Sequence, residues 1–397
     1  MSDRLLRPAL VLGLLSCVGP FAIDMYLPAM PTIAKDLDTT VQAMQGSIIA
    51  YFIAFGLAQL IYGPWADGSG RKPPLYAGIV VFLIGSVFCT YAPTVEWLLV
   101  GRAIQGLGGA ALMVVPRAII RDLYTGPQAT RLMAAVMMVI SVSPMLAPLV
   151  GSGLIAVWDW RAIFGALVIA AVASLAILAL FQPETLAPAD RQPLNARAMR
   201  RGAAVLLTDP LFLGLTFLGG FGTASFFVFI ASASFVYTGA FGLSPVGFSI
   251  AFAVNAIGFF SASQMAGPLG LRHGAARVMA LASAGFAFFT VTLFVLALAG
   301  VVGLWLCMAG LFLANACLGL IIPTAMVMAL DEHGDIAGLA SSLGGTLQML
   351  AGGAMVAAVG PFFDGTATPM LGAIALCGVL VLALSRLVRS RQAAALA

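Results

Sequence analysis

Twelve apolar stretches, each long enough to cross a lipid bilayer as a helix, account for most of this sequence. Only 9% of the residues are charged and 61% are hydrophobic, a balance that excludes a soluble globular domain. Because about 20 apolar residues form one transmembrane helix, we predict an all-α polytopic membrane protein with twelve transmembrane helices. The stretches are residues 8–30, 43–66, 75–93, 96–118, 131–156, 162–182, 211–237, 246–267, 276–299, 302–328, 337–360 and 368–388.

The longest polar stretch, residues 183–209, divides these predicted helices into six and six. We therefore predict an N-terminal six-helix bundle (1–182), a cytoplasmic linker (183–209) and a C-terminal six-helix bundle (210–397). The segments that follow the second span of each half both begin with Gly-Pro, at residues 63–64 and 267–268. This shared start indicates an internal duplication, which predicts two pseudo-symmetric halves related by an axis along the membrane normal.

The basic residues lie mostly on one side of the predicted membrane. If the N-terminus is inside, the outer loops hold only Lys35 and Arg161, and Arg102 lies within a span. Cytoplasmic loops carry such an excess of basic residues, so we predict two cytoplasmic termini in a bacterial inner membrane. The inside residues, scattered over many loops, favour a lipid bilayer and no nucleic acid as the partner; they are Arg4, Arg7, Arg71, Lys72, Arg117, Arg121, Arg131, Arg191, Arg197, Arg200, Arg201, Arg272, Arg277, Arg386, Arg389 and Arg391.

The sequence offers no set of residues for catalysis or metal binding. The two histidines, His273 and His333, fall in predicted cytoplasmic loops, and the five cysteines lie singly within spans. A phosphate-binding loop of the Walker type is also absent. We therefore expect neither an enzyme nor a bound cofactor or metal, and an ion gradient becomes the natural source of energy.

Asp24 is the only acidic side chain well inside a predicted span, near the outer end of the first. A carboxyl at membrane depth is costly and marks a functional residue by default. Because burial favours the neutral form of a carboxyl, such a group can carry a proton. Arg102 and Gln105 lie three residues apart in the fourth span and share a helix face. Arg102 therefore either meets a polar partner inside the protein or extends to the outer surface.

The segment 63–72 contains Gly63, Asp67, Gly70, Arg71 and Lys72 in the pattern Gly-x-x-x-Asp-x-x-Gly-Arg-Lys. One interpretation is an ordinary loop with positive charge at the inner membrane surface. However, the pattern lies between spans two and three of twelve, and it resembles the signature loop of the major facilitator superfamily. Gly68 departs from the signature loop, in which a basic residue is frequent at this position.

This resemblance implies a gate at the inner side of the membrane. In it, Asp67 would pair with Arg117 or Arg121 at the inner end of span four and stabilise the outward-open state.

Two further patterns look like motifs of proton-coupled members of this superfamily. Arg102-x-x-Gln105-Gly106 is similar to its span-four motif, which implies that Arg102 tunes Asp24, by direct contact or through water. Span five holds Pro144 and the pattern Ala147-Pro148-x-x-Gly151-Ser152, a relaxed form of the antiporter motif. Two prolines remove backbone donors and are expected to bend this helix.

The segments 24–31 and 337–344 look like the Bcr/CflA branch of the superfamily, whose members are associated with bicyclomycin and chloramphenicol resistance. This resemblance implies export of small amphipathic compounds in exchange for protons. We expect Tyr26, Gln105, Phe227 and Asn255 to line the substrate cavity, although Asn255 could equally bond a neighbouring helix.

The predicted function is thus that of a drug:proton antiporter that works by alternating access, as a monomer, on a drug or xenobiotic. Two alternatives stay open at this point. One is a proton-coupled carrier for a metabolite such as a sugar, an amino acid or an organic acid. The other is a membrane-embedded enzyme.

Overall fold

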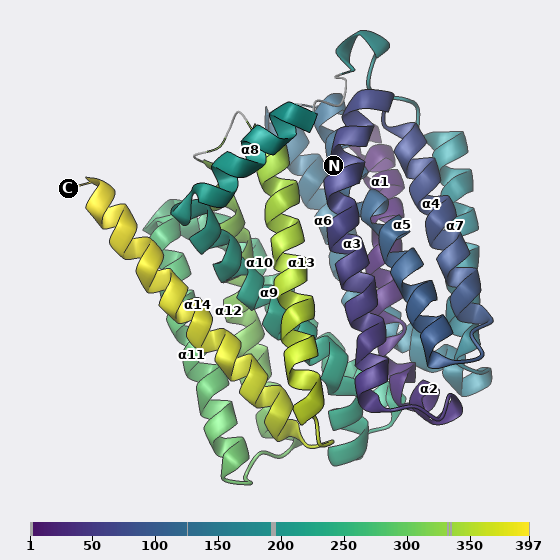
Figure 1. Cartoon of the computed structure of the whole chain (residues 1–397), viewed down its shortest axis with the longest axis vertical. Helices are drawn as coiled ribbons and strands as arrows, with labels where there is room; N and C mark the ends of the chain where they lie inside the picture. Colours follow the sequence, from purple (N-terminus) through teal and green to yellow (C-terminus); the bar gives the residue numbers. More distant parts are fainter. Residues whose placement is uncertain (1–2, 125, 192–195, 332, 334–335, 397) are drawn as a thin grey trace. The chain divides into compact units, whose positions relative to one another are not determined.

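The computed structural model describes residues 3–124, 126–191, 196–331, 333 and 336–396. In this part of the chain every regular element is a helix, and twelve helical segments are long and apolar enough to cross a membrane. The predicted all-α membrane fold is confirmed (Figure 1). The chain divides into two compact units, Met1–Asn195 and Ala196–Ala397, with six of these segments in each. Residues 192–195 of the predicted linker lie outside the described residues.

The described part of the first unit contains nine helical elements, whose order follows the chain. They are α1 (Asp3–Asp24), the 3₁₀ turn η1 (Leu27–Ala29), α2 (Met30–Asp36), α3 (Val41–Ser69), α4 (Lys72–Thr90), α5 (Val95–Leu123), α6 (Gly126–Val157), α7 (Arg161–Phe181) and the 3₁₀ turn η2 (Pro188–Asp190).

The second unit begins with a short helix that precedes its six membrane-length segments. Its elements are α8 (Ala196–Thr208), α9 (Pro210–Phe235), the π-helical turn η3 (Val236–Ala240), α10 (Pro245–His273), α11 (Ala275–Leu298), α12 (Leu304–Asp331), α13 (Ala337–Val359), the 3₁₀ turn η5 (Gly360–Phe362) and α14 (Ala367–Leu396).

The first membrane segment is a broken helix, whereas the apolar stretch 8–30 predicts a continuous one. Helix α1 ends at Asp24, four residues before Pro28, and the chain continues through η1 into α2. A proline ring clashes with the carbonyl of the residue four positions earlier, so a helix cannot pass through Asp24 and Pro28 unchanged. The break places Asp24 at a helix end, where backbone carbonyls lose their helical partners.

Helix α5 packs closely against both α3 and α4 through its small residues. A Cβ atom at Gly106 would overlap the backbone of Tyr51 in α3, and one at Gly108 would overlap the backbone of Phe82 in α4. Small residues let membrane helices approach in this way. The close contact fixes the position of Arg102, one turn earlier on the same helix.

Part of the predicted linker is the amphipathic helix α8, which belongs to the second unit. Leu206 is fully buried in the core of that unit, while Val205 and Leu207 are exposed. A Cβ atom at Gly202 would come within 2.7 Å of Leu339 in α13. Apolar contacts therefore hold α8 against the second unit, although the polar composition of this segment predicts a linker.

Candidate functional site

Arg102 is fully buried in the first unit, so it does not extend to the surface. Its Nη1 donates hydrogen bonds to the Ala22 carbonyl (2.9 Å) and to Gln105 Oε1 (2.8 Å). Its guanidinium carbon lies 4.8 Å from the centre of the Tyr26 ring and 4.6 Å from that of Tyr51. Such cation–π contacts are strongest where water is excluded. A carbonyl, an amide and two aromatic rings thus surround this buried cation, whose Nε and Nη2 have no hydrogen-bond partner among the described residues.

The partners of Arg102 are held by contacts of their own. Gln105 Nε2 donates to Ser86 Oγ (2.8 Å), and Tyr51 donates its hydroxyl proton to the Gly19 carbonyl (3.2 Å). The hydroxyl groups of Tyr26 and Ser47 lie 2.8 Å apart. These bonds orient the side chains around the guanidinium before any ligand arrives.

Arg102 also completes the end of α1. The Phe21 carbonyl accepts a bond from Met25 N and the Ile23 carbonyl accepts one from Tyr26 N, while the Ala22 carbonyl between them accepts from Arg102. A cation at a helix C-terminus also interacts favourably with the helix dipole. Arg102 therefore stabilises the helix end that carries Asp24.

Asp24 is 4% exposed, and Ser143 Oγ of α6 donates a hydrogen bond to its Oδ2 (3.3 Å). Within the described residues no ion pair joins Asp24 to Arg102, so the direct contact that the sequence allows does not occur. Tyr51 lies within electrostatic range of both groups. Asp24 and Arg102 therefore belong to one buried cluster without forming a salt bridge.

Helix α6 packs closely against the break after Asp24. A Cβ atom at Gly151 would overlap the Met25 carbonyl, so only glycine permits this approach. Pro144 and Pro148 both lie inside α6, and Ser143, the partner of Asp24, directly precedes the first of them. The bend expected from the two prolines stays a prediction.

Residues 63–69 of the predicted loop are the last two turns of α3, which is a correction to the sequence interpretation. Ser69 Oγ donates to the Trp65 carbonyl (3.0 Å) within this helix, and only Gly70 and Arg71 connect α3 to α4. Gly70 adopts φ +97°, a conformation that other residues rarely take. Gly63 therefore faces α5 from within α3, with Val114 as its near neighbour.

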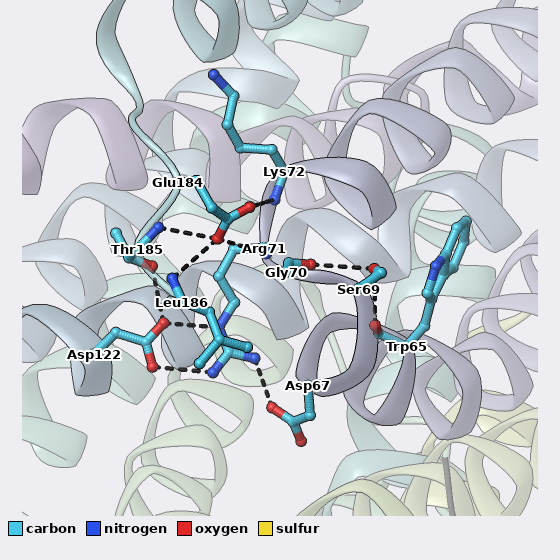
Figure 2. A network of polar contacts seen from close by, with 10 residues as sticks. All are labelled: Trp65, Asp67, Ser69, Gly70, Arg71, Lys72, Asp122, Glu184, Thr185 and Leu186. Atoms are coloured by element: carbon cyan, nitrogen blue, oxygen red, sulfur yellow. Dashed lines mark hydrogen bonds and ion pairs between the residues drawn. The ribbon is translucent and has the colours of Figure 1, made fainter. Parts of the chain in front are cut away.

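The partner of Asp67 also differs from the predicted one. Asp67 pairs with Arg71 at 2.5 Å, and Arg71 forms a second, two-pronged pair with Asp122 at the end of α5 (2.7 and 2.9 Å; Figure 2). The turn at Gly70 brings Arg71 back over Asp67, four residues earlier. Neither Arg117 nor Arg121 forms an ion pair with Asp67 among the described residues, although Arg121 lies within electrostatic range of Asp122.

Glu184, from the predicted linker, binds the start of α4. Its carboxylate accepts hydrogen bonds from the backbone N–H groups of Arg71 (2.9 Å) and Lys72 (3.0 Å), as Figure 2 shows. Partial burial raises the pKa of Glu184, but these two amides and those of Thr185 and Leu186 outweigh it and hold that pKa below its usual range.

Thr185 donates its hydroxyl proton to Asp122 Oδ2 (2.8 Å). Four separate parts of the first unit, the end of α3, the start of α4, the end of α5 and the segment after α7, thus meet in one charged network.

The predicted cavity residues are all buried, and each contacts other parts of the protein. Tyr26 and Gln105 are fully buried beside Arg102. In the second unit, Phe227 lies against Gly352 of α13, and Asn255 Oδ1 accepts a hydrogen bond from Asn315 Nδ2 of α12 (3.3 Å). Asn255 thus bonds a neighbouring helix, which was the alternative interpretation. A role of these four residues in substrate binding stays a prediction.

Comparison with known proteins agrees with this architecture. Residues 12–357 match the family model of the Major Facilitator Superfamily. The chain belongs to that superfamily. It is 33% identical to the MFS-type transporter YdgK of Bacillus subtilis, over 92% of this chain and 91% of that protein. Among solved structures, a D-xylose–proton symporter shares its fold with a TM-score of 0.75, at 15% identity over 96% of each chain.

Two relatives of this superfamily member confirm the resemblance to the Bcr/CflA branch. The bicyclomycin resistance protein homolog of Haemophilus influenzae is 29% identical over 94% of this chain and 93% of that protein. Multidrug resistance protein D of Escherichia coli is 30% identical over 94% of this chain and 93% of that protein. The predicted family and fold are therefore confirmed.

Proposed function

We propose that this transporter exports small amphipathic compounds, such as chloramphenicol- or bicyclomycin-like drugs, in exchange for protons. Its relatives named for drug resistance support the choice of substrate class. The observation that carries proton exchange is Asp24, a buried carboxyl at the break of the first membrane segment whose hydrogen bond comes from a neutral hydroxyl. We further propose a monomer in a bacterial inner membrane, with both termini in the cytoplasm.

In this proposal Asp24 binds and releases the transported proton. A carboxyl removed from water and from direct contact with a cation holds a proton more readily than an exposed one. Asp24 meets both conditions, since it is 4% exposed and its hydrogen-bond partner is Ser143. Proton and drug then compete through their different affinities for the inward- and outward-facing states, because a ligand shifts such an equilibrium only by its differential affinity.

Arg102 acts as a positioning residue rather than as a proton carrier. Its bond to the Ala22 carbonyl holds the end of α1, two residues before Asp24. Tyr51, stacked on Arg102, adds a hydrogen bond to Gly19 of the same helix. A change in the charge of Asp24 therefore acts on the end of α1, whose position Arg102 fixes.

The charged network of Asp67, Arg71, Asp122 and Glu184 is our proposed gating element. Gly70 and Lys72 complete the tight turn, and Arg117 and Arg121 supply further positive charge at the end of α5. Because a single arginine joins two acids from different helices, a rearrangement of one helix must break at least one pair. We expect the network to control the rate of alternating access rather than the affinity for substrate.

The function is tested with everted membrane vesicles that hold an imposed pH gradient, acidic inside. Addition of chloramphenicol to vesicles that contain the protein should dissipate the gradient faster than in vesicles without it. If a panel of neutral drugs moves no protons, and counterflow instead detects a labelled sugar or organic acid, the protein is a metabolite carrier and the proposal fails.

A further inference from the structure

A small pocket lies within the second unit, where α9, α12 and α13 meet. Its walls include Phe212 and Thr216 of α9, Ala329 of α12, and Ser341 and Gly344 of α13. It has a free volume of about 30 Å³. One water-sized group needs about 10–15 Å³ by this measure, so the pocket has room for about two such groups.

Three polar side chains line the pocket without a hydrogen bond to any described residue. Thr216 is only 2% exposed, and Ser341 and Gln348 are half-buried. Hydroxyls elsewhere on the same helices do bond to backbone; Thr324 donates to Leu320 O (2.6 Å) and Thr346 to Ser342 O (2.9 Å). A buried polar group without a partner is costly. The Thr216 hydroxyl is not fully enclosed by described residues and opens into the pocket, so a water molecule or a polar group of a ligand can supply the missing bond.

The lining of the pocket specifies the chemistry of that ligand. Among the residues that the structure describes, no Asp, Glu, Lys or Arg lines the pocket, so these residues offer no counter-charge to a charged group buried there. Hydroxyl and carboxamide side chains each donate and accept, which matches another hydroxyl or amide. The remaining walls, such as Ala329 and Phe212, are apolar.

The shape of the pocket depends on a glycine. A Cβ atom at Gly344 would lie 3.7 Å from Thr216 Oγ1 and 3.8 Å from Phe212 Cζ, which is ordinary contact. Alanine therefore fits without strain and occupies part of the free volume. Phe212 is itself fixed, because its ring packs edge-on against His333, which lies 2.8 Å from Asp209 Oδ2.

We propose that this pocket binds one small neutral end group of the exported compound, a hydroxyl or an amide on a short carbon segment. The rest of the compound would remain outside it, since the volume admits only about two water-sized groups. This inference rests on the proposed export of neutral amphipathic drugs and assigns a part of their recognition to the second unit.

The test measures binding of radiolabelled chloramphenicol, a neutral compound with two hydroxyls and an amide, to the purified full-length protein. Thr216→Val removes the hydroxyl at nearly constant shape, and Gly344→Ala reduces the free volume while favouring the helix. Thr346→Val and Gly338→Ala are the matched controls, because Thr346 bonds its own helix and Gly338 has open space around it.

We expect Kd to rise about two- to tenfold for Thr216→Val, the equivalent of one lost hydrogen bond, and to rise also for Gly344→Ala. Both controls should stay within about twofold of wild type. Two chloramphenicol analogues, one without its hydroxyls and one without its amide, identify the bound group. The analogue that lacks this group should bind wild type and Thr216→Val equally, since the double change removes the same bond twice.

The outcomes separate this inference from the proposed function. If wild type binds chloramphenicol while Thr216→Val and Gly344→Ala bind it equally well, the pocket is not a drug subsite and the proposed export still stands. If wild type binds neither chloramphenicol nor any other neutral drug of the panel, the proposed function fails and the inference fails with it.

Discussion

Replacing Arg102 with methionine should destabilise the first unit strongly. Methionine has a similar length but cannot donate to the Ala22 carbonyl or to Gln105. Hydrogen bonds from a charged donor contribute about 1.5–3 kcal/mol each, and a desolvated cation–π contact contributes about 2 kcal/mol. Relief of the buried charge offsets a part of this sum. We therefore expect a net loss of about 3 kcal/mol.

Arg161 provides a matched control, because it has similar contacts at the surface. It pairs with Asp36 (3.1 Å) and lies over the Trp160 ring (4.2 Å), but its side chain is 34% exposed. Arg161→Met should cost roughly 1 kcal/mol or less.

The assay is thermal unfolding of the purified protein in detergent, followed by tryptophan fluorescence. Arg102→Met should lower Tm at least twice as much as Arg161→Met, with Arg102→Lys between wild type and Arg102→Met. A Tm for Arg102→Met at or above that of Arg161→Met would refute the assignment of Arg102 as the residue that holds the end of α1.

Three further predictions concern the network and the break in the first membrane segment. Glu184→Gln should lower Tm at neutral pH, because an amide nitrogen cannot accept the bond from Lys72 N. Folding lowers the pKa of Glu184 from 4.5, so the stabilisation by its carboxylate is present above pH 4.5 and is lost as the pH falls through the lower folded pKa. The Tm values of wild type and Glu184→Gln should therefore converge in acid. A Tm difference that grows in acid would contradict this. Gly151→Ala forces a methyl group into the Met25 carbonyl and should cost about 1–3 kcal/mol, seen as a lower Tm. Gly153→Ala has open space around it and favours the helix, so it should leave Tm unchanged or raise it slightly. Asp67→Asn should slow drug-driven proton movement in vesicles and leave the Kd for drug unchanged, and loss of binding in the folded variant would count against a gating role.

The fold could be predicted from the sequence because each membrane helix is recognisable from its own residues. An apolar stretch of bilayer length needs no partner to be identified, and the twelve predicted spans correspond to the twelve membrane-length helical segments found among the described residues. The end of α1 at Asp24 could also have been predicted, since Pro28 lies four residues later. The apolar stretch continues past Asp24, however, and gives no sign of the break.

The site was predictable only in part, because its contacts join distant segments. Asp24 and Arg102 were found as isolated charges in apolar helices. In contrast, Tyr51 and Ser143 are uncharged residues among many, and their spacing carries no sign that they meet Arg102 and Asp24. Glu184 was hidden for the same reason, since it binds backbone groups 112 and 113 residues away.

In the proposed mechanism, Asp24 binds the transported proton on one side of the membrane and releases it on the other. This role is tested by comparing Asp24→Asn with Asp38→Asn in everted vesicles under an imposed pH gradient. Asp38 is exposed in the turn after α2 and adopts φ +45°, a conformation that asparagine tolerates, so its variant should behave as wild type. Asp24→Asn should abolish drug-dependent proton movement while counterflow of unlabelled against labelled drug continues. Drug-dependent proton movement at the wild-type rate in Asp24→Asn would show that Asp24 does not carry the transported proton.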